Sequence, residues 1–250
     1  VTITKTPTDK YFASILVETE NILPVAIIPS TKHDCLGIDT GIKTMAVCSD
    51  GREVENMKFL KNNIQRLKVL QKRASRKKKG SSNKRKANKK VSVLHEKITN
   101  RRLNHIHQQT HKLLKDNQFG TICVEDLGIK NMVKNRKLSQ ALSDVSLSKF
   151  YEILEYKCKW RGINFVKVGR TYASTKICNC CGHKNPIDDL KIREWDCENC
   201  QAHNERDPNS SLNIRDEGYR IISGAERPIE PDESLALAGA LTQEKFNSAL

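Results

Sequence analysis

The sequence lacks long apolar runs and has few acidic residues for its size. No stretch approaches the roughly 20 apolar residues of a membrane-spanning helix, and no secretory signal pattern opens the chain. Its 250 residues include 29 Asp and Glu against 44 Lys and Arg, which gives a net charge of +15. This surplus predicts a polyanionic partner, with nucleic acid the first candidate and an anionic membrane surface the weaker alternative.

The cysteines do not form the spread framework of a secreted disulfide protein. Four of the nine lie in two Cys-x-x-Cys pairs, Cys178/Cys181 and Cys197/Cys200, with fifteen residues between the pairs. The other five are scattered: Cys35, Cys48, Cys123, Cys158 and Cys180. This usage indicates a reducing, cytoplasmic compartment and one metal site.

The spacing of the paired cysteines is typical of a structural zinc site. Four thiolates close a tetrahedron around zinc at about 2.3 Å each, which leaves no open position for water. Each pair can form a knuckle, and the intervening residues can form a hairpin. Cys180 and His183 are alternative ligands. The alternative without a metal is that the four residues are reduced core cysteines.

Three acidic residues follow segments that are otherwise apolar or turn-rich. Asp39 ends a predicted core strand within residues 35–51, and Glu125 ends another within residues 119–132. Asp207 lies seven residues after the last cysteine, at the start of a predicted helix. For Asp39 or Glu125 alone, a turn-capping or hydrogen-bonded structural role is an equal alternative.

The three acids together suggest divalent-metal chemistry on phosphodiesters. Two-metal hydrolysis requires several carboxylates from different elements that converge on one point. Such carboxylates would repel one another by up to ~4 kcal/mol per pair at 4 Å and an effective dielectric near 20, so the cluster needs cations. All-oxygen ligation favours Mg²⁺ or Mn²⁺.

Residues 57–118 are predicted to form a long antiparallel helix pair with a basic tip. Apolar residues recur at helical spacing on both sides of a turn at Gly80. Residues 61–102 contain 17 Lys and Arg and a single acid, Glu96. A charge run can be merely a solvated face, but one this one-sided favours phosphate contacts. The candidate contacts are Arg73, Arg76, Lys77, Lys78, Lys79, Lys84, Arg85, Lys86, Lys89 and Lys90.

The remaining segments carry weaker patterns. Residues 10–18 alternate as a half-buried strand does, residues 137–161 have the pattern of one amphipathic helix, and residues 164–169 are predicted to be a strand. Residues 223–250 favour a poorly ordered tail with at most a short helix. The chain begins at Val1, as expected of a fragment or a processed product.

Three of these segments resemble the motifs of a known family. GIDTGIKTMAV, VEDLGIKNM and RDPNSSLNI are similar to the first, second and third motifs of a RuvC-type nuclease core. Their order, with a basic helical insertion and a zinc ribbon between them, resembles the TnpB (OrfB) proteins of insertion sequences. Those proteins are related to the type V CRISPR effectors. The resemblance covers about residues 35–217, and Ser174-Thr175-Lys176 also matches its pattern.

The resemblance implies an α/β fold, with an RNase H-like (RuvC) core that carries the basic helical hairpin and the zinc ribbon as insertions. It also implies RNA-guided DNA cleavage in a prokaryotic cytoplasm, with DNA and a guide RNA as partners. Asp39, Glu125 and Asp207 match the catalytic acids, which would bind Mg²⁺ or Mn²⁺.

The expected divisions follow from the same resemblance. They are a wedge-domain remnant (1–33), core parts one (34–56), two (119–173) and three (205–220), the hairpin (57–118), the zinc ribbon (174–204) and a disordered tail (221–250).

The sequence departs from the family pattern in a few places. Gln201 stands where a glycine usually follows the last cysteine, and Glu205-Arg206 stands where the family more often has Asp-Arg. Ser210-Ser211 replaces two small residues that are usually alanine. Only about 35 residues precede the first motif, so we expect an amino-terminally truncated member. Two rival functions follow: a remnant that binds RNA or DNA without cutting, and a zinc-ribbon protein that acts through partner contacts.

Overall fold

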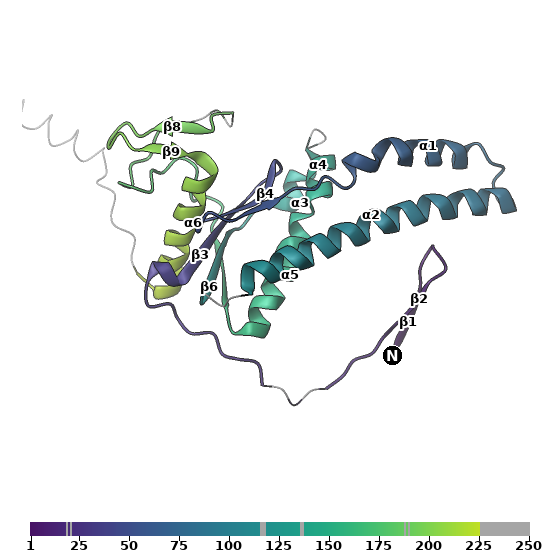
Figure 1. Ribbon diagram of the computed structural model, residues 1–250, viewed down its shortest axis with the longest axis horizontal. Coiled ribbons are helices and arrows are strands. Elements are labelled where there is room, and N and C mark those ends of the chain that lie inside the picture. Colours follow the sequence, from purple (N-terminus) through teal and green to yellow (C-terminus); the bar gives the residue numbers. More distant parts are fainter. Residues whose placement is uncertain are drawn as a thin grey trace, which may run out of the picture.

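A mixed five-stranded sheet organises the chain, with helices on both faces (Figure 1). The computed structural model describes residues 1–225 except 19, 21, 116–118, 136–137, 188 and 190. The sheet strands are β3 (Cys35–Thr40), β4 (Thr44–Cys48), β5 (Glu53–Glu55), β6 (Thr121–Glu125) and β7 (Asn164–Val168). The helices are α1 (Ile64–Ser75), α2 (Ser82–Leu114), α3 (Ile129–Met132), α4 (Ser139–Val145), α5 (Leu147–Arg161) and α6 (Arg206–Ser223), with short 3-10 turns at Lys32–Asp34 and Lys61–Asn63.

The strand order is β5-β4-β3-β6-β7, with β3 at the centre. The two hairpin-connected pairs, β3/β4 and β4/β5, are antiparallel, while β3/β6 and β6/β7 are parallel. The long helical segment between β5 and β6 provides the crossover that a parallel pair requires. The carboxyl ends of β3, β6 and β7 therefore meet at one edge of the sheet.

Alternation along the central strands assigns their side chains to two different layers. Leu36 and Ile38 of β3 join the large core under α5 and α2, whereas Cys35 joins a smaller core that contains Ile214 of α6. Because successive strand residues point to opposite faces, Asp39 shares the α6 face with Cys35. The same alternation puts Glu125 of β6 on the α6 face, together with Cys123.

Helix α6 approaches the sheet closely because a glycine lies at each of two contact points, one on β3 and one on α6. A Cβ on Gly37 of β3 would overlap the backbone of Ser211 and Arg215, and one on Gly218 of α6 would overlap the side chain of Cys123. A side chain at either position would push the helix away from the strands. This close packing carries the amino end of α6 to the carboxyl edge of the sheet.

Helices α1 and α2 form the expected antiparallel pair, which extends beyond the sheet (Figure 1). They pack through a small apolar cluster of Leu67, Leu94 and Ile98. The chain reverses between residues 76 and 81, where Gly80 has φ +80° and the Ser81 hydroxyl caps α2 by accepting from the Lys84 amide at 3.2 Å.

Two expectations about local structure were wrong. The strand expected within residues 10–18 is only β2 (Tyr11–Ser14), paired with β1 (Thr2–Lys5), and both strands are exposed rather than half-buried. The alternation there has no apolar layer to pack against in the described chain. The helix expected over residues 137–161 is broken into α4 and α5, because Ser146 adopts a left-handed conformation with φ +56°.

A second small hairpin carries the paired cysteines. Strands β8 (Glu194–Asp196) and β9 (His203–Glu205) pair antiparallel, and α6 follows β9 directly. We call residues 177–205 the cysteine ribbon; in Figure 1 it lies at the end of the molecule opposite the helix pair.

The described part of the chain includes no helix that is long and apolar enough to cross a membrane. Helix α6 continues through Ser223, three residues beyond the expected end of the last core segment. The rest of the expected tail, residues 226–250, lies outside the described residues.

Candidate metal centres and basic helix pair

The sheet register brings the first two predicted acids together. In the parallel ladder Ile38 is opposite Val124, so Asp39 and Glu125 are the next residues of adjacent strands and face the same layer. Both side chains are half-buried at the carboxyl edge of the sheet. Asp39 stays within the ladder because it is also opposite Val47 in the antiparallel pairing with β4.

Helix α6 brings the third acid to the same edge. Asp207 lies in the first turn of α6, where the positive end of the helix dipole favours a carboxylate. The Ser210 hydroxyl, one turn further along, donates to the Ser174 hydroxyl at 3.0 Å and opposes the rise in the pKa of Asp39. The three acids predicted from the sequence therefore lie at one edge of the sheet, on β3, β6 and the start of α6, but their carboxylate oxygens do not all lie within 4.8 Å of one another.

The electrostatics of the cluster reflect its crowding. Burial, followed by the negative charges of Asp207 and Glu125, raises the pKa of Asp39 to about 7, against the opposing effect of the Arg206 charge. Burial, followed by the charge of neighbouring Asp126, also raises the pKa of Glu125. Carboxylates that repel one another in this way are stabilised by a cation.

Two arginines hold the Asp207 carboxylate. Arg193 donates through Nη1 to both carboxylate oxygens at 3.2 Å, and Arg206 donates through Nε to Oδ1 at 3.0 Å. Neither arginine was among the residues predicted from the sequence. Arg206 could have been found from its adjacency to Asp207, but Arg193 depends on strand pairing within the cysteine ribbon.

A third arginine lies at the same sheet edge. Arg170, just after β7, donates through Nε to the Asp126 carboxylate at 2.9 Å and to the Asp126 carbonyl at 3.0 Å. Asp126 directly follows Glu125, so this pair borders the acid cluster. Sequence reasoning missed it because the contact joins two different loops.

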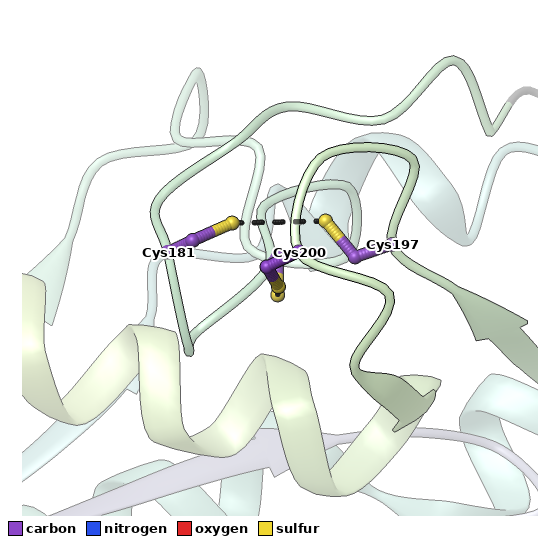
Figure 2. Close-up of side chains that lie close together, drawn as sticks. Cys181, Cys197 and Cys200 are labelled. Carbon is purple, nitrogen blue, oxygen red and sulfur yellow. Dashed lines mark hydrogen bonds between the residues drawn. The ribbon is translucent and has the colours of Figure 1, made fainter.

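The four predicted cysteines form the tightest group of possible metal ligands. Among the described residues they are the one set of three or more His, Cys, Asp or Glu whose ligand atoms all lie within 4.8 Å of one another. The Sγ atoms of Cys178 and Cys200 are 3.7 Å apart, as are those of Cys181 and Cys197; Figure 2 shows the second pair. Neither rival ligand, Cys180 nor His183, belongs to the group.

The sulfur spacing fits a metal tetrahedron rather than a disulfide. Four sulfurs at about 2.3 Å from a central zinc are about 3.8 Å apart, whereas bonded sulfurs are about 2.05 Å apart. The observed 3.7 Å separations agree with the tetrahedron. The donor set of the cluster therefore fits a structural zinc ion.

The two knuckles that present the cysteines have the same backbone geometry. The Gly182 amide donates to the Cys178 carbonyl at 2.8 Å, and the Gln201 amide donates to the Cys197 carbonyl at 2.9 Å. Gly182 has φ +78° and Gln201 has φ +60°. Gln201 thus occupies a left-handed position that favours glycine, which explains why its departure from the family pattern is structurally demanding.

Buried amides fasten the cysteine ribbon to α6. Asn209 and Asn213 of α6 each donate to the Ile177 carbonyl at 2.7 Å, just before the first knuckle. The Asn209 side-chain oxygen Oδ1 accepts from the Asn179 backbone amide at 2.9 Å. The cysteine cluster and the helix that carries Asp207 are therefore held as one unit.

The predicted phosphate-binding residues lie on the helix pair, and most are exposed at its tip. Two of them have protein partners: Lys84 donates to the Ala74 carbonyl at 2.6 Å, at the end of α1, and Lys89 pairs with Asp9 at 2.7 Å. Between α1 and α2 a groove of about 640 Å³ has an apolar floor and a rim of Arg and Lys. Its lining residues are Arg66, Leu70, Lys86, Lys89, Lys90, Val93, Leu94 and Lys97.

One buried carboxylate joins the helix pair to helix α4. Asp144 of α4 is only 5% exposed and accepts from the amides of Leu60 and Lys61 at 2.7 and 2.9 Å. It also accepts from Arg102 of α2 at 3.3 Å. Asp144 therefore binds both the entry to α1 and the middle of α2, and it fixes where the basic pair leaves the core.

Comparison with known proteins identifies matching families over most of the chain. A family model described as "Probable transposase" (OrfB_IS605) matches residues 14–136. A second, described as "Cas12f1-like, TNB domain", matches residues 148–214.

Curated relatives match over long segments. "Putative RNA-guided DNA endonuclease" from Streptomyces pristinaespiralis is 37% identical over 214 residues, covering 86% of this chain and 51% of the relative. "Putative RNA-guided DNA endonuclease InsQ" from Escherichia coli K12 is 29% identical over 248 residues, covering 90% of this chain and 60% of the relative. The chain thus spans about half the length of the curated relatives it matches.

Solved structures share the same architecture. The Cas12f1–sgRNA–target DNA complex aligns with a TM-score of 0.54 and 26% identity, over 72% of this chain and 38% of that one. A CRISPR–Cas12f ternary complex aligns with a TM-score of 0.57 and 23% identity, over 82% and 41%. The chain is thus a mixed α/β protein with the fold of the Cas12f proteins. These matches make it similar to the TnpB (OrfB) proteins of insertion sequences.

Proposed function

We propose that this chain is the nuclease part of a transposon-associated, RNA-guided, metal-dependent DNA endonuclease, with an RNase H-like (RuvC) core. The observation that carries the proposal is the gathering of Asp39, Glu125 and Asp207 at one sheet edge, where burial, followed by the charges of Asp207 and Glu125, raises the pKa of Asp39 to about 7. A cluster that is unfavourable without cations, at the carboxyl edge of an α/β sheet, is the expected position of a catalytic site.

The donor set of this cluster fits Mg²⁺ or Mn²⁺. Its ligand atoms are carboxylate oxygens, which hard divalent cations prefer. Asp39, Glu125 and Asp207 would hold the ions. When bound, such ions activate water and stabilise the leaving oxygen in phosphodiester hydrolysis.

The protein's own groups have separate tasks in this scheme. Asp39 must give up the proton that its raised pKa favours near neutral pH, and the Ser210 hydroxyl supports the resulting carboxylate. Arg206 holds Asp207 at the start of α6. The close contact of α6 with β3 then keeps the third acid beside the first two.

The cysteine ribbon is proposed to be a zinc ribbon with a structural role. The four thiolates would hold Zn²⁺, with no position left for substrate. Through Asn209 and Asn213, the ribbon would keep α6 in place. Zinc binding energy would thereby support the acid cluster as well as the ribbon itself.

DNA and a guide RNA are the proposed partners. The curated relatives are named RNA-guided DNA endonucleases, and the Cas12f1 structure holds sgRNA and target DNA. The basic helix pair supplies exposed cations for phosphates, and the apolar floor of its groove suits sugar or base surfaces. The domain divisions expected from the sequence, from the wedge remnant to the tail, are part of the same proposal.

A cleavage assay tests the proposal directly. The protein, purified with its bound RNA, is incubated with labelled single- and double-stranded DNA and Mg²⁺, beside the Asp39→Ala and Glu125→Gln variants. Wild-type protein is expected to cut DNA, and each variant to lose at least about a thousandfold in rate because a ligand of the ions is missing. Sequencing of the bound RNA then identifies the guide.

The assay also separates the rival functions. Equal cutting by wild type and Asp39→Ala would contradict the assigned site. Tight, salt-dependent nucleic-acid binding with no cutting by any of the proteins would favour a binding remnant. Binding that barely depends on salt would favour a ribbon that acts through protein partners.

A further inference from the structure

Two arginine side chains donate to the Asp207 carboxylate oxygens, which are the atoms that would bind a metal ion. Arg193 Nη1 lies 3.2 Å from both oxygens, and Arg206 lies 3.0 Å from Oδ1 through Nε and through Nη2. A carboxylate has about four acceptor positions, and a guanidinium can only donate. The arginines and a divalent cation therefore compete for one group.

The cysteine ribbon sets the position of Arg193. Glu194 of β8 pairs with Glu205 of β9, so Arg193 and Arg206 lie opposite each other where the hairpin opens. The Arg206 amide donates to the Arg193 carbonyl at 2.7 Å, which extends the pairing by one step. The ribbon therefore delivers Arg193 to the acid cluster from one end while its other end carries the cysteines.

The two arginines differ in their freedom to move. The Arg206 side chain is 13% exposed and directly adjoins Asp207 in the chain, whereas the Arg193 side chain is 45% exposed and reaches Asp207 from another element. Arg206 also donates through Nη1 to the Ile192 carbonyl at 3.5 Å. Arg193 is therefore the partner that can turn away without disturbing the start of α6.

We propose that Arg193 is a positioning residue that exchanges partners during the reaction, an inference that rests on the proposed nuclease function. In the metal-free protein its guanidinium is a counterion for Asp207. Divalent cations bound at the cluster would take the Asp207 oxygens and would reverse the local charge, because two such ions carry four positive charges and the three carboxylates carry three negative charges. The released guanidinium then binds a phosphate of the nucleic-acid strand beside the cluster.

This exchange predicts effects of opposite sign on two ligands. Arg193→Gln removes a competing cation, so divalent cations should bind more tightly. The same change removes a phosphate contact, so nucleic acid should bind more weakly. If Arg193 only stabilised the ribbon, its removal would weaken the binding of both ligands. If it only blocked the site, its removal would strengthen the binding of both.

The test uses two measurements that do not depend on cleavage. Mn²⁺ binding is measured by calorimetry or electron paramagnetic resonance without added nucleic acid, and binding of a labelled DNA strand is measured in Ca²⁺. We expect Arg193→Gln to bind Mn²⁺ about tenfold more tightly and DNA about tenfold more weakly. Arg193→Lys should retain part of both properties, and Lys184→Gln, at an exposed ribbon lysine, should change neither.

The outcomes distinguish this inference from the proposed function. If wild type binds no more Mn²⁺ than an Asp39→Asn control, the metal site itself is wrong. If wild type binds Mn²⁺ through Asp39 but Arg193→Gln binds it no more tightly, the exchange alone is overturned. Tighter Mn²⁺ binding with unchanged or stronger DNA binding would also overturn it, since Arg193 would then only obstruct the site.

Discussion

The two ends of this molecule solve opposite electrostatic problems. At the sheet edge, Asp39, Glu125 and Asp207 crowd negative charge where burial makes it unfavourable, and arginines hold Asp207. On the helix pair, residues 61–102 carry 17 Lys and Arg with one acid, and most of the cations at the tip point to solvent. One end needs cations and the other needs anions, so neither reaches electrostatic balance within the chain.

The comparison teaches that stability is distributed unequally. The acid end is held by buried hydrogen bonds, a close helix–sheet contact and the cysteine cluster. The basic end has a small apolar core of its own and is joined to the large core by the carboxyl-terminal half of α2 and by Asp144. Changes that break each end should therefore differ in both size and reach.

The largest effect is expected at the cysteine cluster. Cys178→Ser removes one of the two buried ligands among the four cysteines and should lose most of the stabilisation that a structural zinc supplies, of order 10 kcal/mol in small zinc modules. Metal analysis should show loss of about one zinc per chain, and proteolysis should cut within residues 177–205. Cys180→Ser is the matched control, since this exposed cysteine lies outside the cluster and its loss should leave the zinc content unchanged.

Neutralising the tip of the helix pair should come next. Lys77, Lys78 and Lys79 replaced by Gln should lower the salt slope of duplex DNA binding by about 2.7, because each phosphate contact contributes about 0.9. At 0.1 M salt this corresponds to a loss of roughly several hundredfold in affinity. The control set is Lys149, Lys159 and Lys167 replaced by Gln; an equal loss there would mean that the whole net charge, rather than the tip, binds DNA.

Breaking the joint between the two ends should be somewhat less severe. Asp144→Ala leaves the amides of Leu60 and Lys61 and the Arg102 guanidinium without their shared acceptor. We expect a loss of about 3 kcal/mol in the free energy of unfolding, measured by urea titration. Glu152→Ala, at an exposed pair with Lys149, should change it by less than about 0.5 kcal/mol; similar losses for both would deny the joint any special role.

Removing negative charge from the acid cluster should stabilise the metal-free protein. The folded-state pKa of Asp39, about 7, lies above the ordinary value of about 3.9, so its ionisation opposes folding above pH 4. With EDTA present, the advantage of Asp39→Asn should grow from about pH 4 to about pH 7, by at most about 4 kcal/mol, and then stay constant. Thermal unfolding at a series of pH values measures this difference in stability. A difference that did not depend on pH would show that the ionisation of Asp39 does not cause it.

The smallest effect should come from the second knuckle. Gln201→Gly relieves a left-handed conformation and should stabilise the ribbon by about 1 kcal/mol, whereas Gly182→Gln at the equivalent position should destabilise it by a similar amount. The zinc concentration needed for half-maximal folding of the metal-depleted protein reports both changes. If both substitutions shifted this zinc concentration in the same direction, the two left-handed positions would not be equivalent in energy.

The sequence was sufficient where the pattern is local or periodic. Apolar spacing and the Gly80 turn predicted α1 and α2, and the two Cys-x-x-Cys pairs predicted the cluster that the structure assembles. The three acids were predicted as a trio from their places at two strand ends and one helix start, and the structure puts those places at one sheet edge. Their catalytic role remains a prediction.

Only the tertiary structure decided the contacts between distant segments. Arg193 reaches Asp207 because β8 pairs with β9 in one register, and Asp144 serves as a joint because α4, α2 and the start of α1 meet at one buried point. Alternation alone allowed residues 10–18 to be a half-buried strand, but burial requires a partner surface, and the described chain supplies none. Residue type and spacing thus determined which ligand groups the chain carries, because these patterns are local. Strand pairing and helix packing determined which charged side chains lie beside those groups, because these contacts join segments that are distant in the sequence.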